Sequence, residues 1–320
     1  MRRDGRAINA HSHDITSPGP PRLEEISEGI WAYVQPDGTW WINNTGFAVG
    51  PQGVIGVDSC STERRTRAFA HAIHTVTTAP VRTLVNTHHH GDHTHGNYLM
   101  SGATIVGHER CREAILDSLM PPPPGIWSEV DWGHLEPAPP FLTYADGVTL
   151  WSGDLRCEVR YVGTPAHTTN DSIVWIPERG VLFAGDLVFN GGTPFALMGS
   201  ISGWIEVLET VLRPLGARTL VPGHGPVCGP EVIDDQLAYL RFIQRAAAEA
   251  KASGLAPLEA ARQLDLGEFA GLLDAERVVG NLHRAYLELD GAERGAPVDL
   301  ARALGEMVAY NGGNPLTCHA

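Results

Sequence analysis

Lysine is almost absent from this chain, which carries a single one, Lys251, among 320 residues. Lys and Arg together number 23 against 37 Asp and Glu, so the formal net charge is −14. A protein that binds nucleic acid is expected to carry a basic stripe. The charge therefore argues against DNA or RNA as a partner, although it leaves a small phosphodiester open as a substrate.

Long apolar runs are also lacking. No stretch of 18 or more apolar residues occurs, and the N-terminal segment MRRDGRAINAHSHD contains no secretory apolar core. A membrane-spanning helix needs about 20 such residues. We therefore expect a cytoplasmic protein with no membrane partner. The five cysteines have no C-x-x-C spacing, which is typical of reduced thiols in a reducing compartment.

Histidine, by contrast, is concentrated in one block. The segment NTHHHGDHTHGN, residues 86–97, contains His88, His90, Asp92 and His93 within six positions. Imidazole and carboxylate are the usual nitrogen and oxygen ligands of zinc, and alternating positions let one loop serve two neighbouring ions. A His-rich surface loop is the alternative. The density of the block favours a two-metal loop.

Three further candidate ligands follow strand-like runs. His167 comes after CEVRYVG, Asp186 ends VLFAGD, and His224 follows RTLV. Alternating or continuous apolar runs of this length are typical of β-strands. Because the ends of rigid strands are where a sheet presents functional groups, we expect these three side chains to join the histidine block. Asp58, which ends the strand-like run VIGV, is expected to hydrogen-bond the metal loop or to cap a helix.

The order H-x-H-x-D-H, followed by His, Asp and His, resembles the di-zinc, glyoxalase II-like branch of the metallo-β-lactamase-fold hydrolases. The resemblance implies an α/β fold, a four-layer αββα sandwich, and two Zn²⁺ ions as cofactors. It also implies three ligands for each ion and one bridging carboxylate: His88, His90 and His167; Asp92, His93 and His224; and Asp186. One subclass of lactamases has a cysteine thiolate at the position of Asp186, and the diiron flavoproteins of this fold have a glutamate at the position of His90. These two differences separate the chain from both groups.

The chemistry of such a site follows from the ions. Two zinc ions about 3.5 to 4 Å apart lower the pKa of a shared water toward about 7 and polarise a carbonyl group. We expect Asp92 and Asp186 to be the catalytic residues that orient the resulting nucleophile. The reaction class is attack on a polarised acyl carbon, as in a thioester, lactone or amide, or stabilisation of an enolate.

The domain organisation is expected to be simple. Residues 1–22 are rich in Pro, Gly and Ser and predict a flexible N-terminal arm, followed by the metallo-β-lactamase-fold domain at 23–228. Residues 229–320 predict a helical C-terminal extension, because amphipathic patterns recur over 231–254, 256–264, 274–291 and 299–313. Such helices are expected to pack on the sandwich, to form a lid or to mediate homodimer formation.

Apolar and aromatic residues near the ligands are candidates for substrate binding. Trp40 and Trp41 lie at the tip of a predicted hairpin, and Trp127 and Trp132 lie in the proline-rich segment 118–140, which precludes a regular helix. The segment 187–200, after Asp186, adds three more candidates: Phe189, Phe195 and Met198. Together they favour an apolar or aromatic substrate, and core packing is the alternative for each.

A narrower resemblance covers residues 23–320. The segments GHERCR, VDWG, GDLVFNGGTPFALMGS, DAERVVGNLHRAYLEL and MVAYNGGNPLTC are similar to the bacterial aromatic polyketide cyclase-thioesterases of the actinorhodin-pathway type. This resemblance implies aldol ring closure and thioester hydrolysis of a poly-β-ketone carried by an acyl carrier protein. An acidic carrier would need a basic patch, for which Arg241 and Arg245 are candidates.

Two alternatives remain. One is a glyoxalase II-like thioesterase or lactonase that acts on a small-molecule metabolite. The other is a mononuclear iron persulfide dioxygenase, which uses only a His, His and Asp set, so the seven-ligand complement argues against it.

Overall fold

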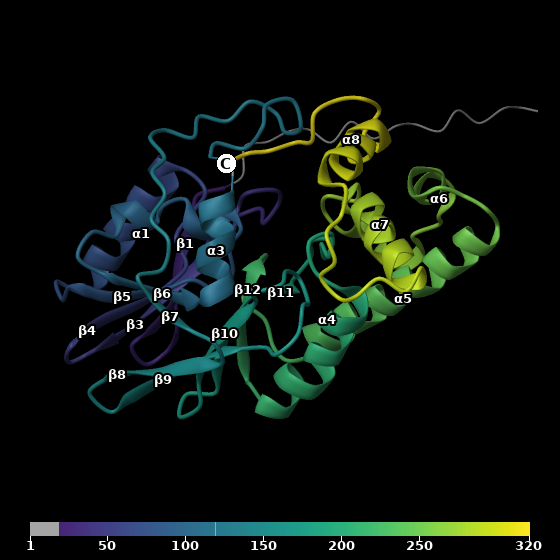
Figure 1. Ribbon diagram of the computed structural model, residues 1–320. Helices are drawn as coiled ribbons and strands as arrows, with labels where there is room; N and C mark the ends of the chain where they lie inside the picture. Colours follow the sequence, from purple (N-terminus) through teal and green to yellow (C-terminus); the bar gives the residue numbers. More distant parts are fainter. Residues whose placement is uncertain (1–18, 119) are drawn as a thin grey trace, which may run out of the picture.

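The computed structural model describes residues 19–118 and 120–320, so most of the arm predicted for 1–22 lies outside the described residues. Two β-sheets lie face to face with helices on their outer sides (Figure 1). The seven-stranded sheet has the order β1-β2-β3-β4-β5-β6-β7, and the five-stranded sheet has the order β12-β11-β10-β9-β8. This arrangement confirms the predicted αββα sandwich.

The first sheet changes from antiparallel to parallel along its width. Its strands are β1 (Arg22–Ser27), β2 (Ile30–Val34), β3 (Thr45–Gly50), β4 (Gly53–Val57), β5 (Val81–Val85), β6 (Thr104–His108) and β7 (Leu142–Tyr144). Strands β1 to β4 pair antiparallel, whereas β4 to β7 pair parallel. Parallel neighbours need crossover connections, and α1 (Glu63–Val76) and α3 (Glu109–Asp117) lie in two of them.

The second sheet is antiparallel except at one edge. Its strands are β8 (Gly147–Ser152), β9 (Leu155–Tyr161), β10 (Ser172–Ile176), β11 (Val181–Phe189) and β12 (Thr219–His224). Strands β11 and β12 pair parallel, and the crossover between them contains α4 (Ile201–Val207), η2 (Leu208–Leu212) and η3 (Arg213–Leu215). Every residue of β10 and β11 is buried, as expected for strands covered on both faces.

Three apolar layers hold the sandwich together. Between the sheets, Ile30 and Val57 of the first sheet belong to the same cluster as Val174 of the second. Phe69 and Ile73 of α1 pack on the outer face of the first sheet. The third layer covers the second sheet with the helices that follow it. Burying one such side chain contributes about 1.5 to 3 kcal/mol, so the layers together supply most of the folding free energy.

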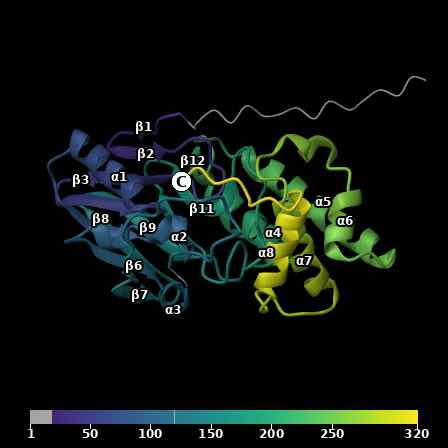
Figure 2. The same cartoon turned by 90° about the horizontal axis from the view of Figure 1, so that it is seen from above.

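The C-terminal part contains the four predicted helices. These are α5 (Val232–Ala252), α6 (Pro257–Gln263), α7 (Arg277–Leu289) and α8 (Leu300–Tyr310), with the short η4 (Gly267–Gly271) between α6 and α7. They gather at one end of the molecule in Figure 2 and share the third apolar layer with β11. After α8 the chain returns to the sandwich, where the Leu316 backbone N–H donates to the Ile126 carbonyl oxygen at 2.8 Å. The C-terminal part therefore contacts both the second sheet and the 118–140 segment.

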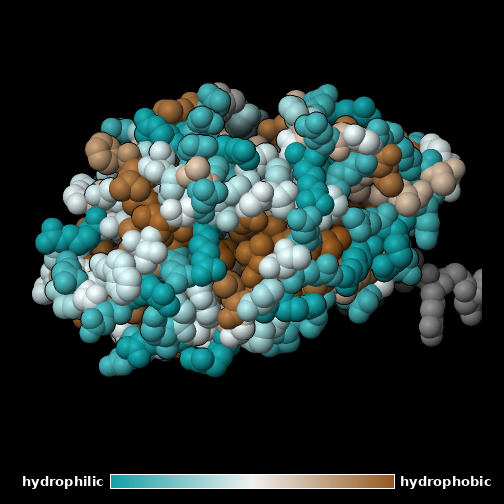
Figure 3. All heavy atoms as spheres, turned by 60° about the horizontal axis from the view of Figure 1, so that its bottom comes forward, coloured by the Kyte–Doolittle hydropathy of each residue, from teal (hydrophilic) through white to brown (hydrophobic). Residues whose placement is uncertain are grey.

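The surface carries both apolar and hydrophilic side chains. On the face shown in Figure 3, apolar side chains gather in the middle and hydrophilic ones surround them. Among the described residues, none of the helices combines the length and the apolar character that crossing a membrane requires.

Candidate metal centre

Four of the predicted ligands lie just after β5. His88 and His90 occupy the loop, whereas Asp92 and His93 lie on α2 (Gly91–Thr94), a single helical turn that begins after His90. The prediction that all four alternate along a loop is therefore wrong from residue 91 onward. Backbone hydrogen bonds close the turn: the His93 N–H donates to the His90 carbonyl oxygen at 3.0 Å, and the His95 N–H donates to the Gly91 carbonyl oxygen at 2.8 Å.

The other three ligands come from the second sheet. His167 lies in the loop between β9 and β10, and His224 is the last residue of β12. Asp186 lies inside β11 rather than at its end, which corrects the predicted strand boundary. The pairing of β11 with β12 is irregular around Gly185, whose φ is +52°. Such a bulge redirects side chains within a strand, and here the Asp186 carboxylate lies against the histidines.

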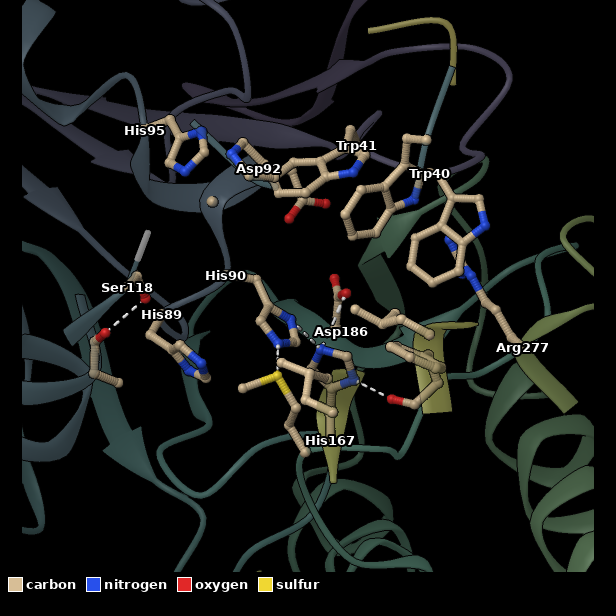
Figure 4. Close-up of a pocket in the computed structure, with 18 of the residues that line it drawn as sticks. Trp40, Trp41, His89, His90, Asp92, His95, Ser118, His167, Asp186 and Arg277 are labelled. Carbon is tan, nitrogen blue, oxygen red and sulfur yellow. Dashed lines mark hydrogen bonds and ion pairs between the residues drawn. The ribbon is translucent and has the colours of Figure 1, made fainter. Parts of the chain in front are cut away.

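The seven side chains form two adjoining groups. One contains His88, His90, His167 and Asp186, and the other contains Asp92, His93 and His224; within each group the ligand atoms lie within 4.8 Å of one another. Figure 4 shows His90, His167 and Asp186 at the centre of the site. Oδ2 of Asp186 lies 3.3 Å from Nε2 of His167, and Oδ1 lies 3.0 Å from Nε2 of His93. Asp186 thus contacts both groups, as a bridging carboxylate would.

Backbone carbonyls orient two of the imidazoles. Nδ1 of His167 donates to the Phe195 carbonyl oxygen at 2.6 Å, and Nδ1 of His224 donates to the Gly38 carbonyl oxygen at 3.1 Å. A carbonyl oxygen only accepts, so each Nδ1 carries the hydrogen. In a neutral ring Nε2 then presents its lone pair to the cluster, which is the arrangement that a metal-binding histidine requires.

The donor set fits metal ions. Nε2 of His93 and Oδ1 of Asp186 are buried and lie 3.0 Å apart without hydrogen-bond geometry between them, and neither has a hydrogen-bond partner among the described residues. Buried polar and charged atoms need a partner, and a cation between them would serve both. One group offers four ligands and the other three. All of them are imidazole nitrogens or carboxylate oxygens, the donors that zinc prefers.

Charges in the cluster act strongly on one another. Burial first, and neighbouring histidines second, lower the pKa of His88 and His90 well below the usual range. Burial would raise the pKa of Asp186, but His224, His93 and His167 hold it well below its usual value. At neutral pH these side chains are therefore neutral imidazoles and an ionised carboxylate, the forms that bind metal.

His93 and His224 behave in the opposite way. Burial alone would lower their pKa values, yet the surrounding carboxylates raise the pKa of His93 well above its usual range and that of His224 to about 9. In the metal-free protein, protons on these two rings would partly offset the negative charge of the aspartates. Metal ions and protons therefore compete for the same nitrogens.

Asp58 supports the cluster from the end of β4, one of the two roles expected for it. Its Oδ1 accepts from the Thr87 backbone N–H at 2.8 Å, while Oδ2 accepts from the Thr87 hydroxyl at 2.8 Å and from Nδ1 of His93 at 2.9 Å. The Thr87 hydroxyl oxygen also lies 3.1 Å from Nδ1 of His88. One carboxylate thus orients one ligand histidine in each group.

A cavity of about 580 Å³ opens over the cluster. Six of the seven predicted substrate contacts line it: Trp40, Trp41, Trp127, Phe189, Phe195 and Met198. Trp132 is not among the lining residues. Its ring packs edge-on against Trp41 with 4.9 Å between centroids, because Trp41 already occupies the position next to the cavity. Trp132 therefore supports the wall from behind.

Other lining residues were not predicted as contacts. His89, His95, Arg277, Leu300 and Leu304 also face the cavity. Figure 4 shows Trp40, Trp41 and Arg277 on one side of the site and His89 and Ser118 on the other. The two histidines belong to the recognisable histidine block. The remaining three come from α7 and α8, whose amphipathic patterns predict helices without indicating which residues approach the metal cluster.

The fold and the cluster define a class of protein, an αββα sandwich with a buried His and Asp metal centre. A family model described as the metallo-beta-lactamase superfamily matches residues 38–224, a range that includes all seven candidate ligands. The chain belongs to the metallo-beta-lactamase superfamily.

Curated relatives point to hydrolases. A hydroxyacylglutathione hydrolase from Rhodospirillum rubrum is 30% identical over 193 residues, which cover 59% of this chain and 64% of that protein. A metallo-beta-lactamase type 2 from Bacteroides fragilis is 26% identical over 218 residues, or 66% of this chain and 77% of that protein. A Caenorhabditis elegans protein named beta-lactamase-like protein 2 homolog matches over 49% of its length, at 26% identity. The match thus spans less than two thirds of the first and third of these relatives.

Solved structures agree on the fold. A metallo-beta-lactamase from Pontibacter korlensis superposes with a TM-score of 0.59 at 20% identity, covering 69% of this chain and 99% of that one. The DIM-1 metallo-beta-lactamase gives a TM-score of 0.58 at 19% identity, covering 71% and 99% of the two chains.

Proposed function

We propose that the protein is a zinc-dependent hydrolase of acyl thioesters with a bulky, apolar acyl group. The observation that carries the proposal is the cluster of seven mostly buried His and Asp ligands, five of which line a large aromatic cavity. The relatives named hydroxyacylglutathione hydrolase support thioester hydrolysis, because an acylglutathione is a thioester. The glyoxalase II-like alternative from the sequence thus gains more support than lactone hydrolysis.

Two zinc ions held by the two ligand groups would supply a Lewis acid for the acyl carbonyl and a water of lowered pKa. Residues of the chain would orient the attacking water. Asp92 lines the cavity, and its Oδ2 lies 3.3 Å from Nε2 of His224. The carboxylates of Asp92 and Asp186 accept hydrogen bonds, so they are positioned to orient an attacking water toward a substrate in the cavity. We assign both as catalytic residues on this basis.

The cavity favours an apolar acyl group over a charged one. The Trp40 ring meets the rings of Phe195 and Trp127 edge-on, with centroids 5.1 and 5.7 Å apart. Among the described lining residues Arg277 is the sole Lys or Arg, and Asp274 pairs with it at 2.8 Å. Glutathione carries two carboxylates and would need free cations. An aromatic or long apolar acyl chain matches this lining better.

A second candidate is the aromatic polyketide cyclase-thioesterase. Its support is the C-terminal helical part, which lies beyond the matched residues 38–224 and contributes Leu300 and Leu304 to the cavity. Ring closure of a poly-β-ketone requires that the chain be held in a folded shape, and aromatic walls serve that purpose. Both candidates end in the release of a carboxylic acid from a thioester.

Carrier docking at Arg241 and Arg245 has a specific obstacle. The Arg241 guanidinium forms an ion pair with Glu209, so part of the predicted basic patch is already compensated. Reversing both charges, with Arg241→Glu and Arg245→Glu, should weaken turnover of a carrier-bound thioester and spare a free one. Equal loss on both substrates would exclude docking at this patch.

The test of the proposed function compares three substrates on zinc-reconstituted protein. These are the N-acetylcysteamine thioesters of acetate, of 2-naphthoate and of a linear poly-β-ketone, with Asp186→Ala as the inactive control. Release of free thiol from the naphthoyl thioester, lost in the control, supports the main proposal. A cyclised product from the poly-β-ketone supports the second candidate. Turnover of none of the three contradicts both.

A further inference from the structure

The Trp40 indole, part of the cavity wall, contacts the residues at the start of α7. It lies in the loop between β2 and β3, far in sequence from α7, and has a relative exposure of 7%. Its Nε1–H donates to Oε1 of Glu276 at 2.6 Å. The same loop supplies the Gly38 carbonyl oxygen that orients His224. One loop therefore joins the aromatic wall to the metal cluster.

Arg277 holds the same indole through its ring face. The Arg277 Cζ atom lies 4.2 Å from the centroid of the Trp40 ring and 5.3 Å from that of Phe189. Phe189 in turn stacks on His224 with 5.1 Å between centroids and 1° between ring planes. A guanidinium near aromatic faces attracts them, more strongly where water is excluded.

Arg277 is itself fixed in place. The side chain is buried, its Nη2 lies 2.8 Å from Oδ2 of Asp274, and its Nη1 donates to the Thr193 carbonyl oxygen at 3.0 Å. These contacts come from two different segments, so the guanidinium has little freedom to rotate. Glu276 and Arg277, at the start of α7, thus contact Trp40 by its N–H and by its ring face at the same time.

We propose that the first turn of α7 determines the acyl-group selectivity of the cavity, with Glu276 and Arg277 as positioning residues that hold Trp40 in one orientation. The inference rests on the proposed thioesterase function for its kinetic readout. A tryptophan side chain without its hydrogen bond can adopt other rotamers, and each of them changes the shape of the wall that a bulky acyl group contacts. A small acyl group does not reach this wall and is insensitive to it.

The distinguishing variants are at Glu276, which does not line the cavity. Glu276→Ala removes the acceptor for the indole N–H, and Glu276→Gln keeps an acceptor oxygen at the same distance along the side chain. Glu268→Ala is the matched control, because Glu268 is an exposed glutamate of η4 in the same C-terminal part. KM and kcat are measured for the naphthoyl and acetyl thioesters of N-acetylcysteamine. The Kd of 2-naphthoate is measured by calorimetry.

For Glu276→Ala we expect KM for the naphthoyl thioester and Kd for 2-naphthoate to rise about tenfold, as for the loss of one charge-assisted hydrogen bond. The kcat values and the KM for the acetyl thioester should stay within about twofold, and Glu276→Gln should restore binding to within about threefold. Unchanged naphthoyl KM in Glu276→Ala, equal loss on both thioesters, or a Glu276→Gln variant as poor as Glu276→Ala would overturn the proposal.

The binding measurement separates this inference from the proposed function. If wild-type protein hydrolyses neither thioester, the thioesterase proposal fails, whereas the Kd of 2-naphthoate still reports on the Trp40 wall. Weaker naphthoate binding in Glu276→Ala and not in Glu268→Ala would then support the positioning role alone. Equal binding by all variants would reject it.

Discussion

Nδ1 of His93 lies 2.9 Å from Oδ2 of Asp58, a residue of the β4 end that does not belong to either ligand group. The carboxylate fixes the imidazole so that Nε2 faces the metal cluster. Asp58 also has a positive φ of 59°, which asparagine tolerates better than most residues. The arrangement makes the contribution of Asp58 to metal binding measurable by a conservative substitution.

Asp58→Asn should weaken zinc binding by about 10- to 100-fold, because an amide NH₂ in place of one oxygen cannot accept from His93 or Thr87. Competition with a fluorescent chelator measures the affinity. Thermal unfolding of the metal-free protein serves as the control for folding. An unchanged affinity in a folded variant would show that Asp58 does not orient His93 for metal binding.

Zinc binding at pH 7 should release protons. Carboxylates raise the pKa of His224 to about 9 in spite of its burial, so this ring is protonated in the metal-free protein below that pH. Zinc needs the neutral imidazole, so binding displaces the proton, and the apparent affinity should increase as the pH rises toward about 9. Calorimetry in two buffers with different ionisation enthalpies detects the release. Identical heats in both buffers at pH 7 would contradict this account.

Gly223→Ala should abolish zinc binding in the group that contains Asp186. A Cβ atom at this position would overlap Oδ1 of Asp186 and would lie 2.8 Å from the Gly185 carbonyl carbon. The carboxylate or the strand must move, because packed strands leave no space for an added methyl group. Gly305→Ala, at a site with an ordinary backbone φ and nothing near the added atom, controls for the general cost of losing a glycine. Full zinc content in Gly223→Ala would show that the strands adjust.

Trp127 should contribute to substrate binding by its ring rather than by its N–H. Its ring meets Trp40 and Trp41 edge-on, at 5.7 and 5.2 Å between centroids. We expect Trp127→Ala to raise KM for the naphthoyl thioester by about tenfold or more, and Trp127→Phe to raise it by about threefold or less. Steady-state kinetics distinguish the two. A Phe variant as impaired as the Ala variant would instead assign a polar role to the indole.

The metal ligands could be predicted from the sequence because their chemistry restricts both residue type and spacing. His88, His90, Asp92 and His93 are close in the chain, whereas His167 follows β9, Asp186 lies within β11 and His224 ends β12. The four C-terminal helices were predictable for a similar reason, since amphipathic periodicity is a local property.

The errors arise where position depends on tertiary contacts. The strand β11 continues past Asp186 to Phe189, and its pairing with β12 is irregular around Gly185; a single strand carries no signal of its partner's register. Trp132 and Trp127 lie in the same proline-rich segment, yet only Trp127 lines the cavity. Trp40 and its hydrogen-bond partner Glu276 are 236 residues apart in the sequence, and Arg277, which contacts the same ring, follows Glu276. No local pattern predicts such a contact.

The most direct test of the account is the zinc content of the purified, reconstituted protein, measured by mass spectrometry together with naphthoyl thioester turnover. Wild-type protein should hold two zinc ions per chain and hydrolyse the thioester, and Asp186→Ala should lose at least one ion and the turnover with it. A wild-type protein that binds no zinc, or that keeps its full turnover after chelation, would contradict the account.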